Sequence, residues 1–227
     1  MLLITFSITS SILTAQANKT KTIWALIPII GSLLFIALYI IAAFLYPGGY
    51  ETNKTATGFS WTNNYWCNLL HDDAINGETN IGKPFAVTGL FILGIALFTF
   101  WVIFPKQIDA NKSFGLIIPA SGMIAMLSAF LLVTDIDHDL VINFAGFFGS
   151  VATTGTIICL YRKKWFGLFA FGLFNILLIV LNNYLYHTKG MMIYLPVVQK
   201  ISFLSFLVWI CCIEMKLYRQ ISKTINN

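Results

Sequence analysis

The chain has 227 residues, of which 58% are hydrophobic and only 10% are charged, and its mean hydropathy is +0.79. Soluble domains carry roughly 25% charged residues, so this composition excludes an ordinary water-soluble domain and indicates a membrane protein. The net charge of +5 follows from membrane topology, as argued below, so we expect no nucleic-acid partner.

The N-terminal residues MLLITFSITSSILTAQA form a short apolar run that ends in Ala15-Gln16-Ala17. This pattern resembles a signal peptide with its cleavage site, but no basic segment precedes the apolar run. We therefore expect an uncleaved segment that lies at the membrane interface, and a signal peptide is the alternative.

Apolar runs follow, each about long enough to cross a hydrocarbon core of ~30 Å as a helix. Charged residues, proline or glycine bound each run, as expected at helix ends. Lipid admits only helices or closed barrels, and these runs are too long and too continuously apolar for barrel strands. The sequence predicts an all-α polytopic membrane protein, with one domain over residues 1–227. This domain is a six-helix transmembrane bundle with spans near 23–46, 84–104, 114–134, 139–161, 165–187 and 191–215.

Residues 47–83 form a connection that is too long for a simple turn. YPGGY at its start is a turn that ends the first helix. Its middle, FSWTNNYWCNLLHDD, has helical periodicity, so we expect a short interfacial helix whose polar face folds over the bundle. The alternative is a helix with a solvated polar side. One face would carry Trp61, Tyr65 and Leu69, and the other Ser60, Asn64 and Asn68.

Lysine and arginine are distributed unequally between the two sides of the predicted bundle. The side with both termini has ten of them and the other side has four, so the positive-inside rule places both termini in the cytoplasm. Seven of the nine acids lie on the opposite, outer side. The ten cationic residues are Lys19, Lys21, Lys106, Lys112, Arg162, Lys163, Lys164, Lys216, Arg219 and Lys223.

All three histidines fall on the predicted outer side. His71 lies in the first outer loop, His138 lies between the third and fourth helices, and His187 ends the fifth helix. Neutral imidazoles are good zinc ligands, and three of them leave a fourth position for a water whose pKa falls to about 7. We predict a zinc or similar divalent-metal site from these histidines. The alternative is that they are solvated loop residues and a helix cap.

Carboxylates and other polar side chains accompany the histidines. Carboxylates commonly orient metal-bound histidines, and one can act as a general base. Polar residues within a bilayer normally face the bundle interior, although helix packing is the alternative role. Ser60 and Asn143 would position substrate or water. The predicted catalytic residues are Ser60, Asp72, Asp135, Asp139 and Asn143.

Two further charged residues lie in the sixth predicted helix. Lys200 follows Pro196 by about one turn, and such a lysine either extends to the outer interface or pairs with the outer acids. Glu214 is placed towards the cytoplasmic end. No acid or base is expected near the middle of a span, which argues against transport coupled to protons or ions.

YPGGY after the first helix, the polar segment around Ser60 and the acid-rich turn TDIDHD occur in a characteristic order. This order resembles a six-helix bacterial and archaeal membrane family, domain-of-unknown-function family 998, over most of the chain. That family is distantly similar to the DRAM/Sfk membrane proteins, and the serine, aspartate and histidine inventory resembles the CREST membrane hydrolases. The resemblance implies zinc and cleavage of a lipid amide or ester. The chain lacks the CREST pair of histidines four residues apart on a late helix, since only His187 is there.

We therefore expect an integral protein of the bacterial inner (cytoplasmic) membrane with a polar His/Asp site on its outer face. The predicted activity is metal-dependent hydrolysis of a membrane lipid. The alternative is a non-catalytic protein that binds or transports lipid, or that has a structural or regulatory role.

Overall fold

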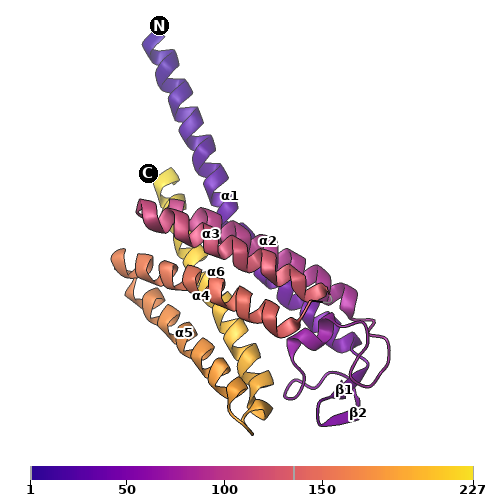
Figure 1. Cartoon of the computed structure of the whole chain (residues 1–227). Helices are drawn as coiled ribbons and strands as arrows, with labels where there is room; N and C mark the ends of the chain where they lie inside the picture. Colours follow the sequence, from indigo (N-terminus) through magenta and orange to yellow (C-terminus); the bar gives the residue numbers. More distant parts are fainter. Residues whose placement is uncertain (1, 135, 227) are drawn as a thin grey trace.

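The computed structural model describes the backbone of residues 2–134 and 136–226, and the side chains of residues 24–134, 136–137 and 139–223. In this part of the chain six helices are long and apolar enough to span a membrane, which confirms the predicted all-α bundle (Figure 1). These helices are α1 (Leu2–Leu45), α2 (Lys83–Gln107), α3 (Lys112–Ala129), α4 (His138–Arg162), α5 (Phe166–His187) and α6 (Leu195–Asn226).

Shorter elements lie in the connections. Strands β1 (Gly48–Tyr50) and β2 (Asn53–Thr57) form an antiparallel hairpin, and the 3-10 helix η1 (Trp66–Leu70) follows. Two further 3-10 turns, η2 (Phe130–Val133) and η3 (Met192–Tyr194), extend α3 and introduce α6.

The helices form a closed ring. Each packs against its neighbours in sequence, and α6 returns to pack against α1. Large aromatic residues fill the core, among them Phe35, Phe100, Trp101 and Trp209, each at most 1% exposed. The Trp209 indole also donates a hydrogen bond of 2.8 Å to the carbonyl oxygen of Leu168, which ties α6 to α5.

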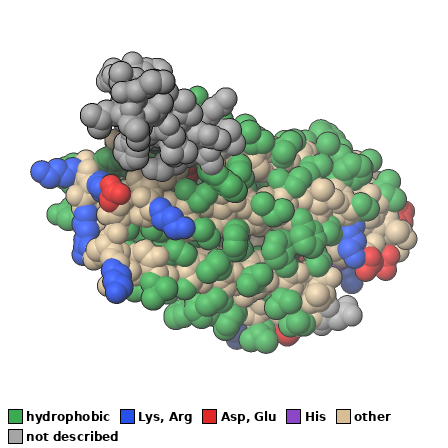
Figure 2. All heavy atoms as spheres, turned by 90° about the horizontal axis from the view of Figure 1, so that it is seen from above, with side chains coloured by type: hydrophobic (Ala, Val, Ile, Leu, Met, Phe, Trp, Pro, Cys, Tyr) green, Lys and Arg blue, Asp and Glu red, His purple; other side chains and the backbone are tan. Residues whose placement is uncertain are grey.

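The two ends of the ring differ in character. Both termini lie towards one end, which we call the basic end, and residues 46–82 cover the other, which we call the cap end (Figure 1). Figure 2 shows an apolar surface between charged side chains that gather towards the two ends. The assignment of the basic end to the cytoplasm stays a prediction.

Helix α1 is longer than a span. Its 44 residues measure about 66 Å at 1.5 Å per residue, more than twice the hydrocarbon thickness of ~30 Å. The N-terminal half continues without a break beyond the ends of the other helices (Figure 1). The segment expected to lie along the interface is therefore the extension of the first span.

The interfacial helix expected within residues 59–73 is largely absent, because only Trp66–Leu70 are helical, as a 3-10 turn. Side chains compete with the helix for the backbone here. The Asn64 side chain accepts a hydrogen bond of 2.8 Å from the Ser60 N–H, and the Asn68 side chain accepts one of 2.7 Å from the Tyr65 N–H. These bonds fold the segment into turns.

Close helix contacts depend on glycine at one position in particular. A Cβ atom on Gly122 of α3 would lie 2.1 Å from Cγ of Trp101, 2.4 Å from its Cδ1 and 2.5 Å from its Cβ. These atoms are at the root of a buried indole, so the ring cannot move aside by a simple rotation.

We predict that Gly122→Ala destabilises the bundle by about 1–3 kcal/mol, the usual cost of overpacking a core. Thermal unfolding of the purified protein in detergent measures the change. Gly115→Ala on the same helix is the matched control, because a Cβ there meets nothing within 4 Å. Equal melting temperatures for the two variants would contradict the close α2–α3 contact.

Candidate functional site at the cap end

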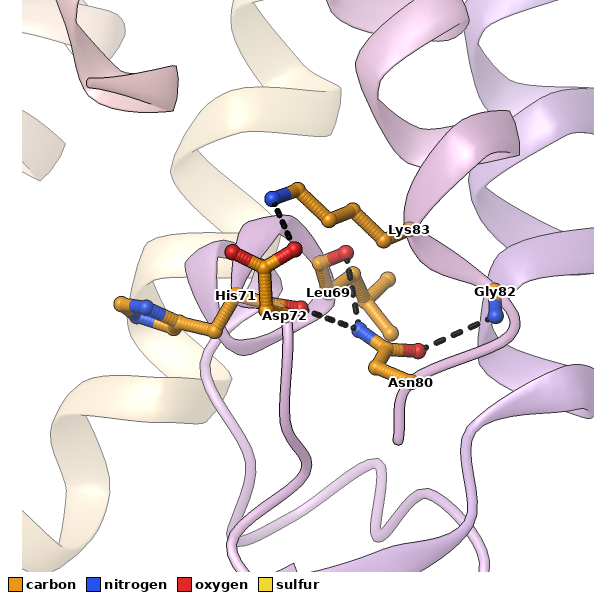
Figure 3. A network of polar contacts seen from close by, with 6 residues as sticks. All are labelled: Leu69, His71, Asp72, Asn80, Gly82 and Lys83. Atoms are coloured by element: carbon orange, nitrogen blue, oxygen red, sulfur yellow. Dashed lines mark hydrogen bonds and ion pairs between the residues drawn. The ribbon is translucent and has the colours of Figure 1, made fainter. Parts of the chain in front are cut away.

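Two buried asparagines give residues 46–82, the cap, a fixed conformation. Asn64 is fully buried, and its side-chain N–H donates 2.8 Å to the Gly49 carbonyl. Asn80 donates to the carbonyls of Leu69 and His71 at 3.1 and 3.0 Å and accepts from the Gly82 N–H (Figure 3). Because an amide group both donates and accepts hydrogen bonds, each asparagine joins backbone segments that are separate in the sequence.

Aromatic rings fasten the cap to the bundle. Trp66 packs edge-on against Phe35 and Tyr39 of α1, with ring centroids 5.8 and 5.5 Å apart. It packs in the same way against Phe203 of α6, at 5.5 Å. The single turn of η1 thus inserts its indole between the first and last helices, which places the cap over the α1–α6 contact.

Lys200 occupies the junction between cap and bundle. Its side chain is 7% exposed, and its ammonium donates to the backbone carbonyl of Asn64 in the cap and, at 2.9 Å, to that of Pro196 in its own helix. The Phe59 ring centroid lies 5.7 Å from the same nitrogen, within the range of a cation–π contact. Sequence reasoning expected this lysine to extend outward or to pair with acids. Neutral carbonyls satisfy it instead, because the cap supplies the Asn64 carbonyl and the lysine's own helix supplies that of Pro196.

The Cys67 thiol beside this junction is unsuited to nucleophilic chemistry. Burial raises its pKa to about 11, and the nearby Lys200 opposes the shift only weakly. The thiolate is the reactive form of cysteine, and this pKa keeps Cys67 in the thiol form near neutral pH. Burial likewise raises the pKa of the neighbouring Tyr65.

Asp72 forms an ion pair with Lys83 at 2.6 Å, at the start of α2. The Asp72 side chain is 87% exposed, so the pair contributes about 0–1 kcal/mol. Figure 3 shows the His71 ring directed away from this pair. Asp72 and His71 are therefore neighbours in sequence whose side chains point apart.

Tyr186 joins the end of α5 to the start of α4. The Tyr186 hydroxyl donates 2.8 Å to a carboxylate oxygen of Asp139 in the first turn of α4, and the Tyr186 ring lies edge-on to that of His187, with centroids 5.0 Å apart. His138 is the first residue of α4, but its side chain and all of Asp135 lie outside the described residues. Asp137 is exposed and caps α4 by accepting from the Leu140 N–H at 2.8 Å.

The remaining predicted catalytic residues make local bonds. Asn143 is exposed and donates 2.8 Å to the Asp139 carbonyl of its own helix, which corrects the expectation that it faces the bundle interior. Its amide needs no interior partner, because its own helix supplies an acceptor. The Ser60 hydroxyl accepts from the Asn63 amide at 2.8 Å.

Metal ligation has limited support from the described residues. No three His, Cys, Asp or Glu side chains among them gather closely enough to hold an ion. These residues do not make a metal site by themselves. A site of the predicted kind requires the His138 side chain.

Comparison with known protein families, curated proteins and solved structures gives no match.

We predict that Lys200→Met loosens the cap, because it removes the side-chain donor to the buried carbonyl of Asn64. Hydrogen bonds to charged groups contribute ≈1.5–3 kcal/mol, which corresponds to roughly a tenfold to hundredfold rise in cap opening. The rate at which a membrane-impermeant maleimide labels Cys67, followed by peptide mass, reports this opening.

Lys189→Met is the matched control, because Lys189 is an exposed lysine at the same end of the bundle. The same labelling rate in Lys200→Met and wild type would show that the cap is held without this lysine.

Proposed function

We propose that this integral membrane protein binds a membrane lipid in a groove between α1 and α6. The groove has a volume of about 340 Å³ and lies within the two spans. Its lining is apolar apart from one hydroxyl and two thiols. The lining residues are Ile29, Ser32, Leu33, Ile36, Leu204, Leu207, Val208, Cys211, Cys212 and Met215.

The chemistry of the surroundings supports an acyl chain as the occupant. Both helices face hydrocarbon over this length, and Leu33 and Val208 in the lining are 64% and 52% exposed. Dispersion contacts are lost wherever a concave apolar wall has no atoms against it. A flexible hydrocarbon chain restores these contacts without burying a polar group.

The position of the groove favours a lipid of the leaflet at the basic end. Along α6 the lining runs from Leu204 to Met215, and the cationic residues Lys216, Arg219 and Lys223 follow directly. The Lys216 ammonium lies 4.3 Å from the Trp165 ring centroid, whereas Arg219 and Lys223 are exposed. A lipid phosphate beside the end of the groove would meet these two charges, each worth about 1 kcal/mol near an anionic surface.

We predict that Val208→Trp reduces the lipid retained by the purified protein roughly tenfold. The indole would occupy groove volume and remove the contacts of about two methylene groups, at ≈0.8 kcal/mol each. Native mass spectrometry after detergent washing measures the retained lipid. Leu177→Trp on α5 is the control, because Leu177 is 65% exposed and lies outside the groove. Equal retention in both variants would contradict a lipid site in this groove.

A second candidate function is metal-dependent hydrolysis of a lipid at the cap end. The Asp139–Tyr186 bond favours it, since it holds the start of α4, where His138 lies, against the end of α5, where His187 lies. A bound metal would polarise a carbonyl or activate water. His138 and His187 would supply its imidazole ligands, and Asp139 would orient one of them. This proposal includes the location expected from the sequence, the bacterial inner membrane.

We predict for this second candidate that the purified protein carries about one zinc ion per chain, held by imidazole ligands. The double variant His138→Ala/His187→Ala would lose that metal, as elemental analysis would show. Asn183→Ala, one turn before His187 on α5, is the control. Wild-type protein without a transition metal, or metal content unchanged in the double variant, would exclude the hydrolase.

A further inference from the structure

We propose that Glu214 is a proton-binding site inside the bundle, and that it exchanges its proton with solvent at the basic end. Glu214 lies on α6, in the half of this helix nearer to the basic end, and is only 1% exposed. The neighbouring buried residues on α6 are apolar: Leu207, Ile210, Ile213 and Leu217. Sequence reasoning placed this acid towards the cytoplasmic end without finding that it is buried.

The Glu214 carboxyl group lacks a hydrogen-bond partner for one of its oxygens among the described residues. One of its oxygens, Oε2, is fully buried and receives no hydrogen bond from any described residue. An ionised carboxylate only accepts hydrogen bonds, whereas a protonated one also donates. A charge left in this state within a membrane is costly, and intramembrane acids normally face a partner or mark an ion pathway.

No cation among the described residues forms an ion pair with this acid. Among the described residues the ion pairs are Lys83–Asp72 and Lys163–Asp109, both outside the bundle interior. Lys216 follows Glu214 closely on α6, but its ammonium lies against the Trp165 ring. The described side chains of α1, residues 24–45, contain no charged group.

A proton is the ligand that fits these surroundings. Metal ions need several ligands, and the described residues hold no group of three His, Cys, Asp or Glu that includes Glu214. A single proton removes the charge and leaves a hydroxyl that can donate. Another titratable neighbour on the same helix is the half-buried Cys211, one turn earlier.

The route to solvent leads towards the basic end. Gln107 is the last residue of α2 and so lies at that end, and its side-chain oxygen and nitrogen are also buried without a partner among the described residues. Buried polar atoms of this kind commonly hold water. Glu214 itself lies nearer the end of α6 than its start, so the shorter path for its proton leads to solvent at the basic end.

Two measurements on the full-length protein test this proposal. Dicyclohexylcarbodiimide, an apolar reagent that adds to protonated carboxyl groups within membranes, is expected to modify the peptide that contains Glu214. Glu214→Gln would abolish the adduct, and Glu51→Gln, at an exposed acid of the cap, would leave it unchanged. Absence of the adduct at Glu214 in wild-type protein would overturn the proposal, and this result does not depend on the folding of any variant.

Infrared spectroscopy tests the exchange itself. The carbonyl band of a protonated carboxyl is expected in the wild type, shifted in D2O, and lost in Glu214→Gln. A missing band would show an ionised group, and a band unaffected by D2O would show a sealed one, so either result refutes the proposal. Lipid retention in Val208→Trp is measured separately, so failure of the groove and failure of the proton site are distinguishable.

Discussion

The absence of hydrogen-bonding groups in hydrocarbon constrains every polar side chain of this bundle. Many of the described hydroxyl and amide groups meet the constraint inside their own helix, by donating to the carbonyl four residues earlier, whereas the Ser205 hydroxyl and the Gln107 amide have no partner among the described residues. Lys200 does the same with Pro196, which is why a buried ammonium is satisfied without an acid. An ionised carboxylate has no proton to donate, so this solution is closed to Glu214. The other donors of this kind include Thr88, Thr99, Ser128, Asn143, Thr156, Asn175, Asn182, Asn183 and Ser202.

The same constraint divides the molecule into two halves with different properties. At the cap end, asparagine amides and the Trp66 indole hold a folded connection against α1 and α6, and Lys200 closes the junction from below. Towards the basic end, the α1–α6 contact opens into an apolar groove, and α6 carries the buried Glu214, whose Oε2 has no partner among the described residues. The proposed lipid site and the proposed proton site both lie in this second half, whereas the predicted histidine site lies at the cap end.

The sequence predicted correctly those features that depend on one segment of the chain alone. Six apolar runs predict six spans, because span length and apolar composition are properties of each run alone. It failed for residues 59–73, where helical periodicity was present but Asn64 and Asn68 bond to the backbone instead. The sequence also did not reveal the hydrogen bonds of Asn80 or the burial of Glu214, since both depend on how segments distant in the sequence pack together. Polar spacing on α4 predicted an inward face, yet Asn143 is exposed, because a back-bonded amide is tolerated at the helix surface.

The contact between Lys200 and Asn64 joins residues 136 positions apart, and this separation has a consequence for biosynthesis. The cap emerges early in translation, when only the first helix precedes it. Its junction with the bundle cannot close until the last helix has been made and inserted beside the first. Until then the cap lacks both Lys200 and the Phe203 ring that packs on Trp66. Completion of the cap therefore reports that the whole ring has assembled, and a chain truncated before α6 would carry an unfinished cap.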